Sequence, residues 1–230
     1  MRRSLDRGSA DHGWLKTRYS FSFADYYDPE QMGFGVLRVI NDDRIAGGGG
    51  FPMHAHRDME ILTYIIEGAL EHRDSMGNTG VISAGEIQQM SAGTGVRHSE
   101  FNASGEASVH LLQIWIVPDK AGYEPKYDQK DFSARLANSE FVLLASRSGR
   151  EGSAVIHQDV DLFAVKSKIA GQKTHALGTG RGLWLQVIRG GVTGAGVTLT
   201  AGDGLGLTDV DSVDLSWSAG AEFLIFDLAV

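Results

Sequence analysis

Residues 51–60 read Phe-Pro-Met-His-Ala-His-Arg-Asp-Met-Glu, with two histidines one residue apart. Side chains of an extended strand alternate between its two faces, so His54 and His56 would share one face. A second segment repeats this spacing with a histidine and a carboxylate, at His98 and Glu100. We therefore predict that three imidazoles and one carboxylate, carried by two strands, converge on one metal ion inside a β-barrel.

The type of donor limits the metal. The chain has no cysteine, so a metal site must use nitrogen and oxygen ligands. Imidazole and carboxylate suit Fe, Zn, Cu, Ni and Mn, and ligand type alone does not choose among them. Two histidines, one carboxylate and open positions form the ligand set of non-haem Fe(II) oxygenases. We therefore favour one Fe(II) per chain, with Zn, Cu, Ni, Co or Mn as alternative divalent metals.

Glu60 is the alternative to Glu100 as the carboxylate ligand. It follows His56 by four residues, which carries it roughly 13 Å along an unbroken strand. A bulge or bend would have to bring it back, so spacing favours Glu100. Otherwise Glu60 is interpreted as an exposed strand end or as a hydrogen-bond acceptor behind the ligands.

The remaining histidines have no partner at ligand spacing. We interpret them as surface residues or as hydrogen-bonded core residues: His12, His72, His110, His157 and His175. His110 is also a candidate for an outer partner of a ligating imidazole, because such imidazoles need a second hydrogen bond.

The rest of the chain is typical of many short strands joined by tight turns. Thirty glycines separate short apolar runs, whereas there are only four prolines. Strands are predicted over residues 33–40, 60–67, 86–90, 96–102 and 108–117. This spacing indicates an antiparallel sandwich or barrel. A turn is predicted at Asn41-Asp42-Asp43, and residues 1–32 are predicted to be an irregular, aromatic-rich arm.

The polar segment 119–136 is predicted to connect two domains, residues 1–130 and 131–230. A weak internal echo, between residues 64–68 and 186–190, favours a second domain of the same kind. In the implied alignment, the positions of the four ligand candidates are taken by Ala176, Gly178, Leu215 and Trp217. We therefore expect the second domain to lack metal ligands.

Composition excludes some classes of function. The formal net charge of −8 argues against a general nucleic-acid binder, which would carry a basic face. The first residues have no apolar core behind their arginines, unlike a secretory signal, and no segment has membrane-spanning length. We expect a soluble cytoplasmic protein without direct nucleic-acid or membrane contact. The acidic charge is compatible with a protein partner.

Two sets of residues resemble the motifs of the cupin superfamily. The first set is Gly48, His54, His56, Glu60 and Gly68, and the second is Gly85, Gly93, His98 and Asn102. Both motifs are longer than usual, and Ser91 stands where cupins usually have proline. Residues 49–60, 71–80 and 90–100 resemble the pirin family in particular, as do residues 11–14 and 20–29. The resemblance is dense over residues 10–118 and thin afterwards.

The resemblance implies a bicupin, which is an all-β protein of two antiparallel β-barrels of the jelly-roll type. Its first barrel would hold one metal through His54, His56, His98 and Glu100, and its second barrel would lack a site. Short bacterial members are similar to quercetin 2,3-dioxygenases, which open the heterocycle of a flavonol with dioxygen and release carbon monoxide. The implied partners are a flavonol-like aromatic substrate and dioxygen, and Glu100 would also act as the general base.

Two other functions remain open from the sequence. Some pirins resemble transcription cofactors that sense the redox state of a metal and bind a partner protein without turnover. Another cupin enzyme could use the same ligands on a different substrate. Phe51, Met53 and Met90 are the candidates for pocket-lining residues near the ligands.

Overall fold

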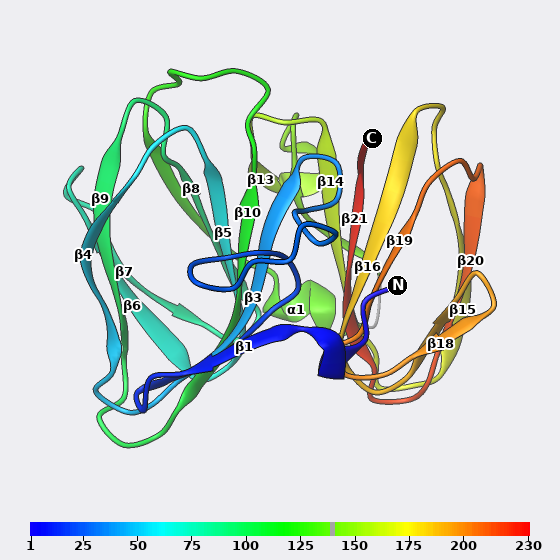
Figure 1. Cartoon of the computed structure of the whole chain (residues 1–230), viewed down its shortest axis with the longest axis horizontal. Helices are drawn as coiled ribbons and strands as arrows, with labels where there is room; N and C mark the ends of the chain where they lie inside the picture. The colour runs from blue at the N-terminus through cyan, green and yellow to red at the C-terminus, as the bar shows by residue number, and fades with distance from the viewer. Residues whose placement is uncertain (139–140) are drawn as a thin grey trace.

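The computed structural model describes residues 1–138 and 141–230 and is built almost entirely of β-strands. The described helical segments are short: η1 (Ser4–Asp6), α1 (Ser133–Leu136) and η2 (Arg150–Gly152). The strands form two lobes side by side, one from the first half of the chain and one from the second (Figure 1). The predicted all-β class is confirmed.

The first lobe is a jelly roll of two sheets. The larger sheet has the order β1 (Gly8–Asp11), β2 (Leu15–Tyr19), β3 (Leu37–Ile45), β10 (Val109–Ile116), β5 (Glu60–Glu67), β8 (Glu86–Ser91) and β11 (Lys126–Asp131). The smaller sheet has the order β4 (Gly50–His56), β9 (Val96–Asn102), β6 (Ala69–Asp74) and β7 (Thr79–Ser83). Two separate sheets replace the closed barrel that was predicted, so each sheet keeps its own edges.

The second lobe repeats this plan. Its larger sheet has the order β13 (Ala154–Val155), β12 (Val142–Ser146), β14 (Val160–Lys166), β21 (Glu222–Ala229), β16 (Arg181–Arg189) and β19 (Gly204–Leu207). Its smaller sheet has the order β15 (Gly171–Ala176), β20 (Ser212–Trp217), β17 (Val192–Gly194) and β18 (Val197–Leu199). A domain boundary at residue 130 stays a prediction; β11, on the first sheet, ends at Asp131.

A shared apolar core joins the lobes. It combines Leu62 and Ile114 of the first lobe with Leu162, Leu224 and Phe226 of the second. These side chains come from the outward faces of the two larger sheets, which pack against each other. The larger sheet of the first lobe therefore has two different environments: the interior of its own jelly roll on one face, and the second lobe on the other.

The predicted turn at residues 41–43 is wrong, because these residues lie inside β3. The alternation of the strand separates them: Asn41 and Asp43 share the face of the jelly-roll interior, whereas Asp42 faces the second lobe. Asp42 accepts hydrogen bonds from Arg7 and His110, which lie 35 and 68 residues away in the sequence. Distant partners therefore stabilise polar residues in the middle of a strand, where local propensity predicts a turn.

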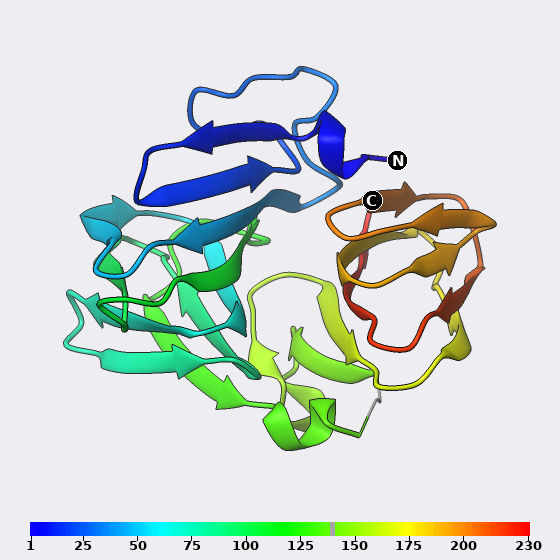
Figure 2. The ribbon, with the colours of Figure 1, turned by 90° about the horizontal axis from the view of Figure 1, so that it is seen from below.

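The N-terminal arm is also more regular than predicted. In β2 the side chains of Leu15, Thr17 and Tyr19 are buried, and those between them are exposed, as expected for a strand that covers a core with one face. β1 and β2 extend the larger sheet, and η1 reaches the second lobe (Figure 2). There Arg2 and Gly204 exchange two backbone hydrogen bonds of 2.7 Å.

In the second lobe, β15 pairs with β20 as β4 pairs with β9. Lys173 lies opposite Leu215 and His175 opposite Val213, just as His54 lies opposite His98 and His56 opposite Val96. The structural counterparts of His54 and His56 are therefore Lys173 and His175, so the alignment with Ala176 and Gly178 was shifted. His175 instead shares a hydrogen bond of 2.8 Å with Asp227.

Among the described residues, the groups of three or more side chains that could hold a metal all lie in the first lobe. No helix in the described part of the chain is long and apolar enough to cross a membrane.

Candidate metal centre

Strand pairing brings the three predicted histidines together. His54 on β4 lies directly opposite His98 on β9, and a register shift between Phe51 and His54 precedes this pair. His56 follows on the same face of β4. One nitrogen of each ring lies within 4.8 Å of the others, and the ring centroids are 4.4 to 4.9 Å apart. The three imidazoles thus lie together as predicted, and their role as metal ligands stays a prediction.

The protonation of these rings favours metal binding. His54 Nδ1 donates to the carbonyl oxygen of Pro52 at 2.9 Å, which leaves Nε2 with a free lone pair. Burial, together with the neighbouring histidines, lowers the pKa of His56 to about 4 and that of His98 to about 3. The latter two rings are therefore neutral at pH 7 and can donate lone pairs.

His98 is the residue whose surroundings best fit a metal ligand. The residue is buried, and neither of its ring nitrogens has a hydrogen-bond partner. Buried polar atoms without partners are uncommon and need an explanation. A divalent metal between the three imidazoles satisfies one of these nitrogens, so the residues present fit such an ion.

Glu100 lies beside this cluster but in a second group. Its carboxylate oxygen meets ring nitrogens of His72 and His98 within the same 4.8 Å limit, whereas the other group contains His54, His56 and His98. The buried carboxylate accepts hydrogen bonds from Gln113 Nε2 at 2.9 Å and Gln88 Nε2 at 3.4 Å. The side-chain amides of Gln113 and Gln88 fix the orientation of the Glu100 carboxylate. Glu100 as a fourth ligand stays a prediction.

His72 is a site residue that we did not predict from the sequence. It lies opposite Glu100 across β6 and β9, it is fully buried, and its Nδ1 has no hydrogen-bond partner. Its Nε2 shares a hydrogen bond of 3.2 Å with Asp74, and its ring stacks on Tyr127 with centroids 4.7 Å apart. The sequence did contain a signal for this position, because Asp74 follows His72 at the spacing by which Glu100 follows His98. The pairing of β6 with β9 is what brings His72 beside Glu100.

Asp43 is a second residue that the sequence misplaced. Burial raises the pKa of its carboxyl group to about 7, and the charges of Asp42 and Glu100 add to this effect. Asp43 lines the same cavity as the histidines. The cavity therefore contains two acidic groups, Asp43 and Glu100, in different surroundings.

The cavity above the histidines has a volume of about 280 Å³ and largely apolar walls. Phe23, Phe51 and Trp115 line it, and Trp115 stands edge-on to His56 with centroids 4.9 Å apart. Of the lining residues proposed from the sequence, Phe51 is confirmed. Met53 is 45% exposed and outside the lining. Met90 is also outside the lining; it is buried in an apolar cluster that includes Ile61 and Trp115 of the cavity wall.

Glu60 begins β5 and is buried away from the histidine cluster. The interpretation of Glu60 as an exposed strand end is therefore wrong. Its carboxylate accepts hydrogen bonds from Gln89 and Ser91, both at 2.8 Å, and contacts His157 Nδ1 at 2.9 Å. His110 likewise does not support a ligating imidazole, because it faces the other side of the larger sheet and bonds to Asp42.

Comparison with known proteins agrees with this geometry. A family model described as Pirin matches residues 2–116. The chain is 47% identical over 228 residues to a protein of Escherichia coli (strain K12) named quercetin 2,3-dioxygenase, covering 99% of this chain and 97% of the relative. The chain belongs to the pirin family. A second family model, described as Quercetinase C-terminal cupin domain, matches residues 143–228, which confirms the bicupin fold.

Solved structures of the pirin family superpose closely on this chain. The crystal structure of YhhW from Escherichia coli matches with a TM-score of 0.95 and 47% identity, covering 99% of this chain and 96% of that one. The structure of the same bacterial pirin in complex with nickel(II) gives a TM-score of 0.94 and 46% identity, covering 99% and 97%. A pirin-like protein of Caulobacter vibrioides is 42% identical, covering 99% of each chain.

Proposed function

We propose that this pirin is a metal-dependent dioxygenase that cleaves a flavonol-like aromatic substrate. One divalent transition metal would be held by His54, His56 and His98, with Glu100 as the fourth ligand. The observation that carries the proposal is the buried His98, whose two ring nitrogens lack partners at the base of an aromatic cavity. The nickel-bound pirin and the relatives named quercetin 2,3-dioxygenase support it.

The cavity suits a flat aromatic molecule. Its volume of about 280 Å³ is near the lower end of the roughly 300–1,000 Å³ typical of small-molecule sites. Phe51 and Trp115 give the cavity aromatic walls that a planar ring can contact, and such walls exclude water from the reacting atoms. Because the imidazoles lie at the base of the cavity, the end of the substrate nearest to them would be the end that reacts.

The bound metal would supply Lewis acidity, which lowers the pKa of a coordinated hydroxyl group. Within the chain, Glu100 would accept the proton of the substrate's 3-hydroxyl. Gln113 and Gln88 hold its carboxylate, so the base is oriented before the substrate arrives. Asp43, on another wall of the cavity, is a candidate to hold a proton near neutral pH.

The ligand set favours Fe(II), as for other non-haem oxygenases with histidine and carboxylate ligands. Zn, Cu, Ni, Co and Mn remain alternatives, because nitrogen and oxygen donors accept each of them. The test is dioxygen consumption with quercetin after the protein has been stripped and reloaded with each metal in turn. We expect turnover with at least one metal, and loss of bound metal and turnover in His98→Ala.

Two variants sharpen this experiment. Glu100→Gln keeps the shape of the side chain but removes the base, and we expect it to retain metal while turnover falls by about 100-fold or more. His12→Ala removes an exposed histidine outside the cluster and is the matched control. Unchanged turnover in Glu100→Gln would remove Glu100 from the role of base. Tight metal binding without turnover of quercetin would favour a redox-sensing regulatory protein or another substrate.

A further inference from the structure

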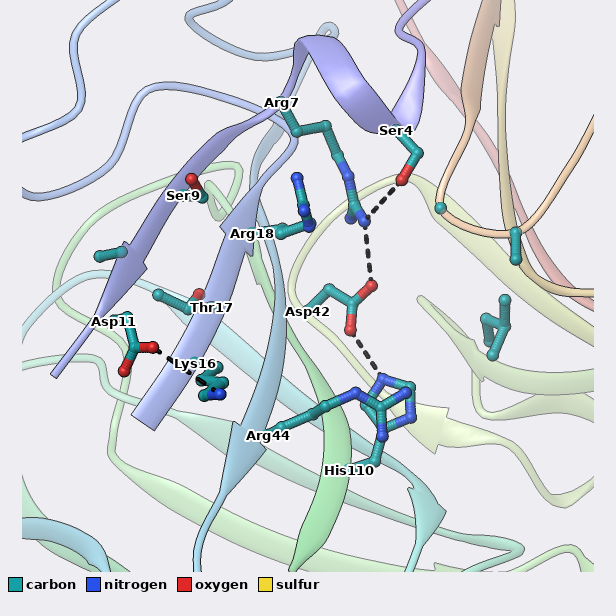
Figure 3. A pocket seen from close by; sticks show the side chains of 14 residues that line it. Ser4, Arg7, Ser9, Asp11, Lys16, Thr17, Arg18, Asp42, Arg44 and His110 are labelled. Carbon is teal, nitrogen blue, oxygen red and sulfur yellow. Dashed lines mark hydrogen bonds and ion pairs between the residues drawn. The ribbon is translucent and has the colours of Figure 1, made fainter. Parts of the chain in front are cut away.

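A second cavity lies on the outer face of the larger sheet of the first lobe, whose inner face lines the cavity with the histidines. It has a volume of about 530 Å³ and is bounded by η1, β1–β3, β10 and the turn at Ala201 and Gly202 of the second lobe (Figure 3). It therefore lies where the N-terminal arm and both lobes meet. None of the predicted metal ligands lines it.

Strand register gathers basic side chains on this face. Lys16, Arg44 and His110 lie side by side across β2, β3 and β10, and Arg18 lies opposite Asp42 in the neighbouring row. These residues alternate with the ones that face the interior of the jelly roll, so all of them face the cleft. The gathering follows from sheet pairing and is not visible as a basic run in the sequence.

Arg7 lies deep in the cleft, with its side chain only 2% exposed. Its Nη2 donates to Asp42 Oδ2 at 3.1 Å and approaches Ser4 Oγ at 3.5 Å. Its Nε and Nη1 are buried without a hydrogen-bond partner. Burial lowers the pKa of Arg7, and the charge of Arg18 acts in the same direction. The single carboxylate of Asp42 therefore leaves this buried cation with unfilled donors.

The other charges of the cleft do not supply the missing acceptors. Asp42 also accepts from His110 Nε2 at 2.7 Å, so two cationic or donor groups share it. Asp11 lies 3.8 Å from Lys16. Across the described chain, Arg18 and Arg44 form no ion pair with a carboxylate. The cleft thus carries four basic side chains against two carboxylates.

We propose that this cleft binds a small molecule through an oxyanion, a phosphate or carboxylate group. Arg18 and Arg44 hold the anion at the mouth through their exposed side chains. The buried guanidinium of Arg7, whose Nε and Nη1 have no partner in the protein, attracts it from the base of the cleft. Arginine suits this role because its planar fork of donors matches the oxygens of both groups. The proposal is independent of the proposed dioxygenase activity.

The opposite wall supports a binding role. The turn at Gly202 leaves no room for a side chain, since a Cβ there would lie 2.4 Å from Ser4 Oγ and 2.7 Å from Arg7 Nη2. The glycine therefore lets the second lobe close over the guanidinium. An arginine with a purely structural role in such a place would have its buried donors paired within the protein.

The test is calorimetric titration of the full-length, zinc-loaded protein with inorganic phosphate and, separately, with succinate, in a low-salt chloride buffer. We expect saturable binding of at least one anion. The exposed pair Arg18→Gln/Arg44→Gln should weaken it by about tenfold or more. These two side chains have no ion pair to lose, so the fold should persist. Binding of phosphate alone assigns a phosphate group, and binding of succinate alone assigns a carboxylate.

Two controls separate this site from other sources of binding. Lys126→Gln/Lys173→Gln removes the same charge from exposed residues of β11 and β15, outside the cleft, and should leave the affinity unchanged. His98→Ala removes a metal ligand candidate and should also leave it unchanged. The proposal fails if neither anion binds, if the lysine pair weakens binding as much as the arginine pair, or if only His98→Ala abolishes binding.

Discussion

Replacing Asp43 with asparagine should make the metal-free protein more stable at neutral and alkaline pH. Asp43 is fully buried, and its pKa rises from 3.8 to about 7 on folding. Between these values the unfolded chain ionises this group while the folded chain keeps it protonated. Stability therefore falls as pH rises from about 4 to 7. Asparagine has nearly the same shape and cannot ionise, so it removes this loss.

The size of the effect follows from the same two values. A difference of one pKa unit corresponds to 1.36 kcal/mol, so the loss above pH 7 is roughly 4 kcal/mol. For a chain of this length, that corresponds to a Tm difference on the order of 10 °C. The variant should resemble the wild type near pH 4, gain steadily up to pH 7, and keep a constant advantage above it.

The assay is the Tm of metal-stripped protein at pH 4.5, 6, 7 and 8.5, measured for the wild type and Asp43→Asn. Asp6→Asn, at an exposed aspartate of η1, is the matched control and should show no such trend. A Tm difference between Asp43→Asn and wild type that does not change with pH would refute the reasoning. It would mean that Asp43 is ionised in the fold at all these pH values.

Two further predictions concern packing around the two cavities. Gly202→Ala should cost on the order of 2 kcal/mol of unfolding free energy, because its φ is +85° and the new Cβ meets Ser4 and Arg7. Gly196→Ala, with φ +75° and nothing within 4 Å, should cost only about 1 kcal/mol in the same chemical denaturation; equal losses would show that the arm moves aside freely. Trp115→Leu should keep the metal and raise KM for the flavonol about three- to tenfold, since it removes an aromatic wall beside His56. A reduced metal content in that variant would place Trp115 in the support of the ligand instead.

The sequence predicted the parts of the site that depend on local spacing. His54 and His56 share a face because of the strand period, and the strand that carries His98 occurs with the predicted bounds 96–102. The residues that it missed depend on pairing between distant strands. His72 meets Glu100 only because β6 lies beside β9. Asp43 belongs to a run of polar residues that locally predicts a turn. It is buried in β3 only because other strands of the first lobe cover it.

The cleft between the lobes also depends on pairing between distant segments, so local spacing does not predict it. Arg7, Asp42 and His110 come from three separate segments, and no short motif joins them. Their meeting depends on the position of the arm, which Asp203 of the second lobe fixes by accepting from the backbone of Ser4 and from Arg3, at 2.7 and 2.8 Å. Local sequence propensity does not predict contacts between segments so far apart in the chain.

One sheet separates the two polar sites of this pirin. Along β3, Asn41 and Asp43 face the cavity with the histidines, whereas Asp42 and Arg44 face the cleft. β10 divides in the same way, with Gln113 on the inner face and His110 on the outer. Strand alternation thus lets the same two strands contribute to two sites with different chemistry. Asn41, Asp43 and Gln113 face the cavity into which β4 and β9 carry the histidines, whereas Asp42, Arg44 and His110 face the cleft. The two sites share backbone but no side chain, and they are coupled through the charge of Asp42, which raises the pKa of the adjacent Asp43.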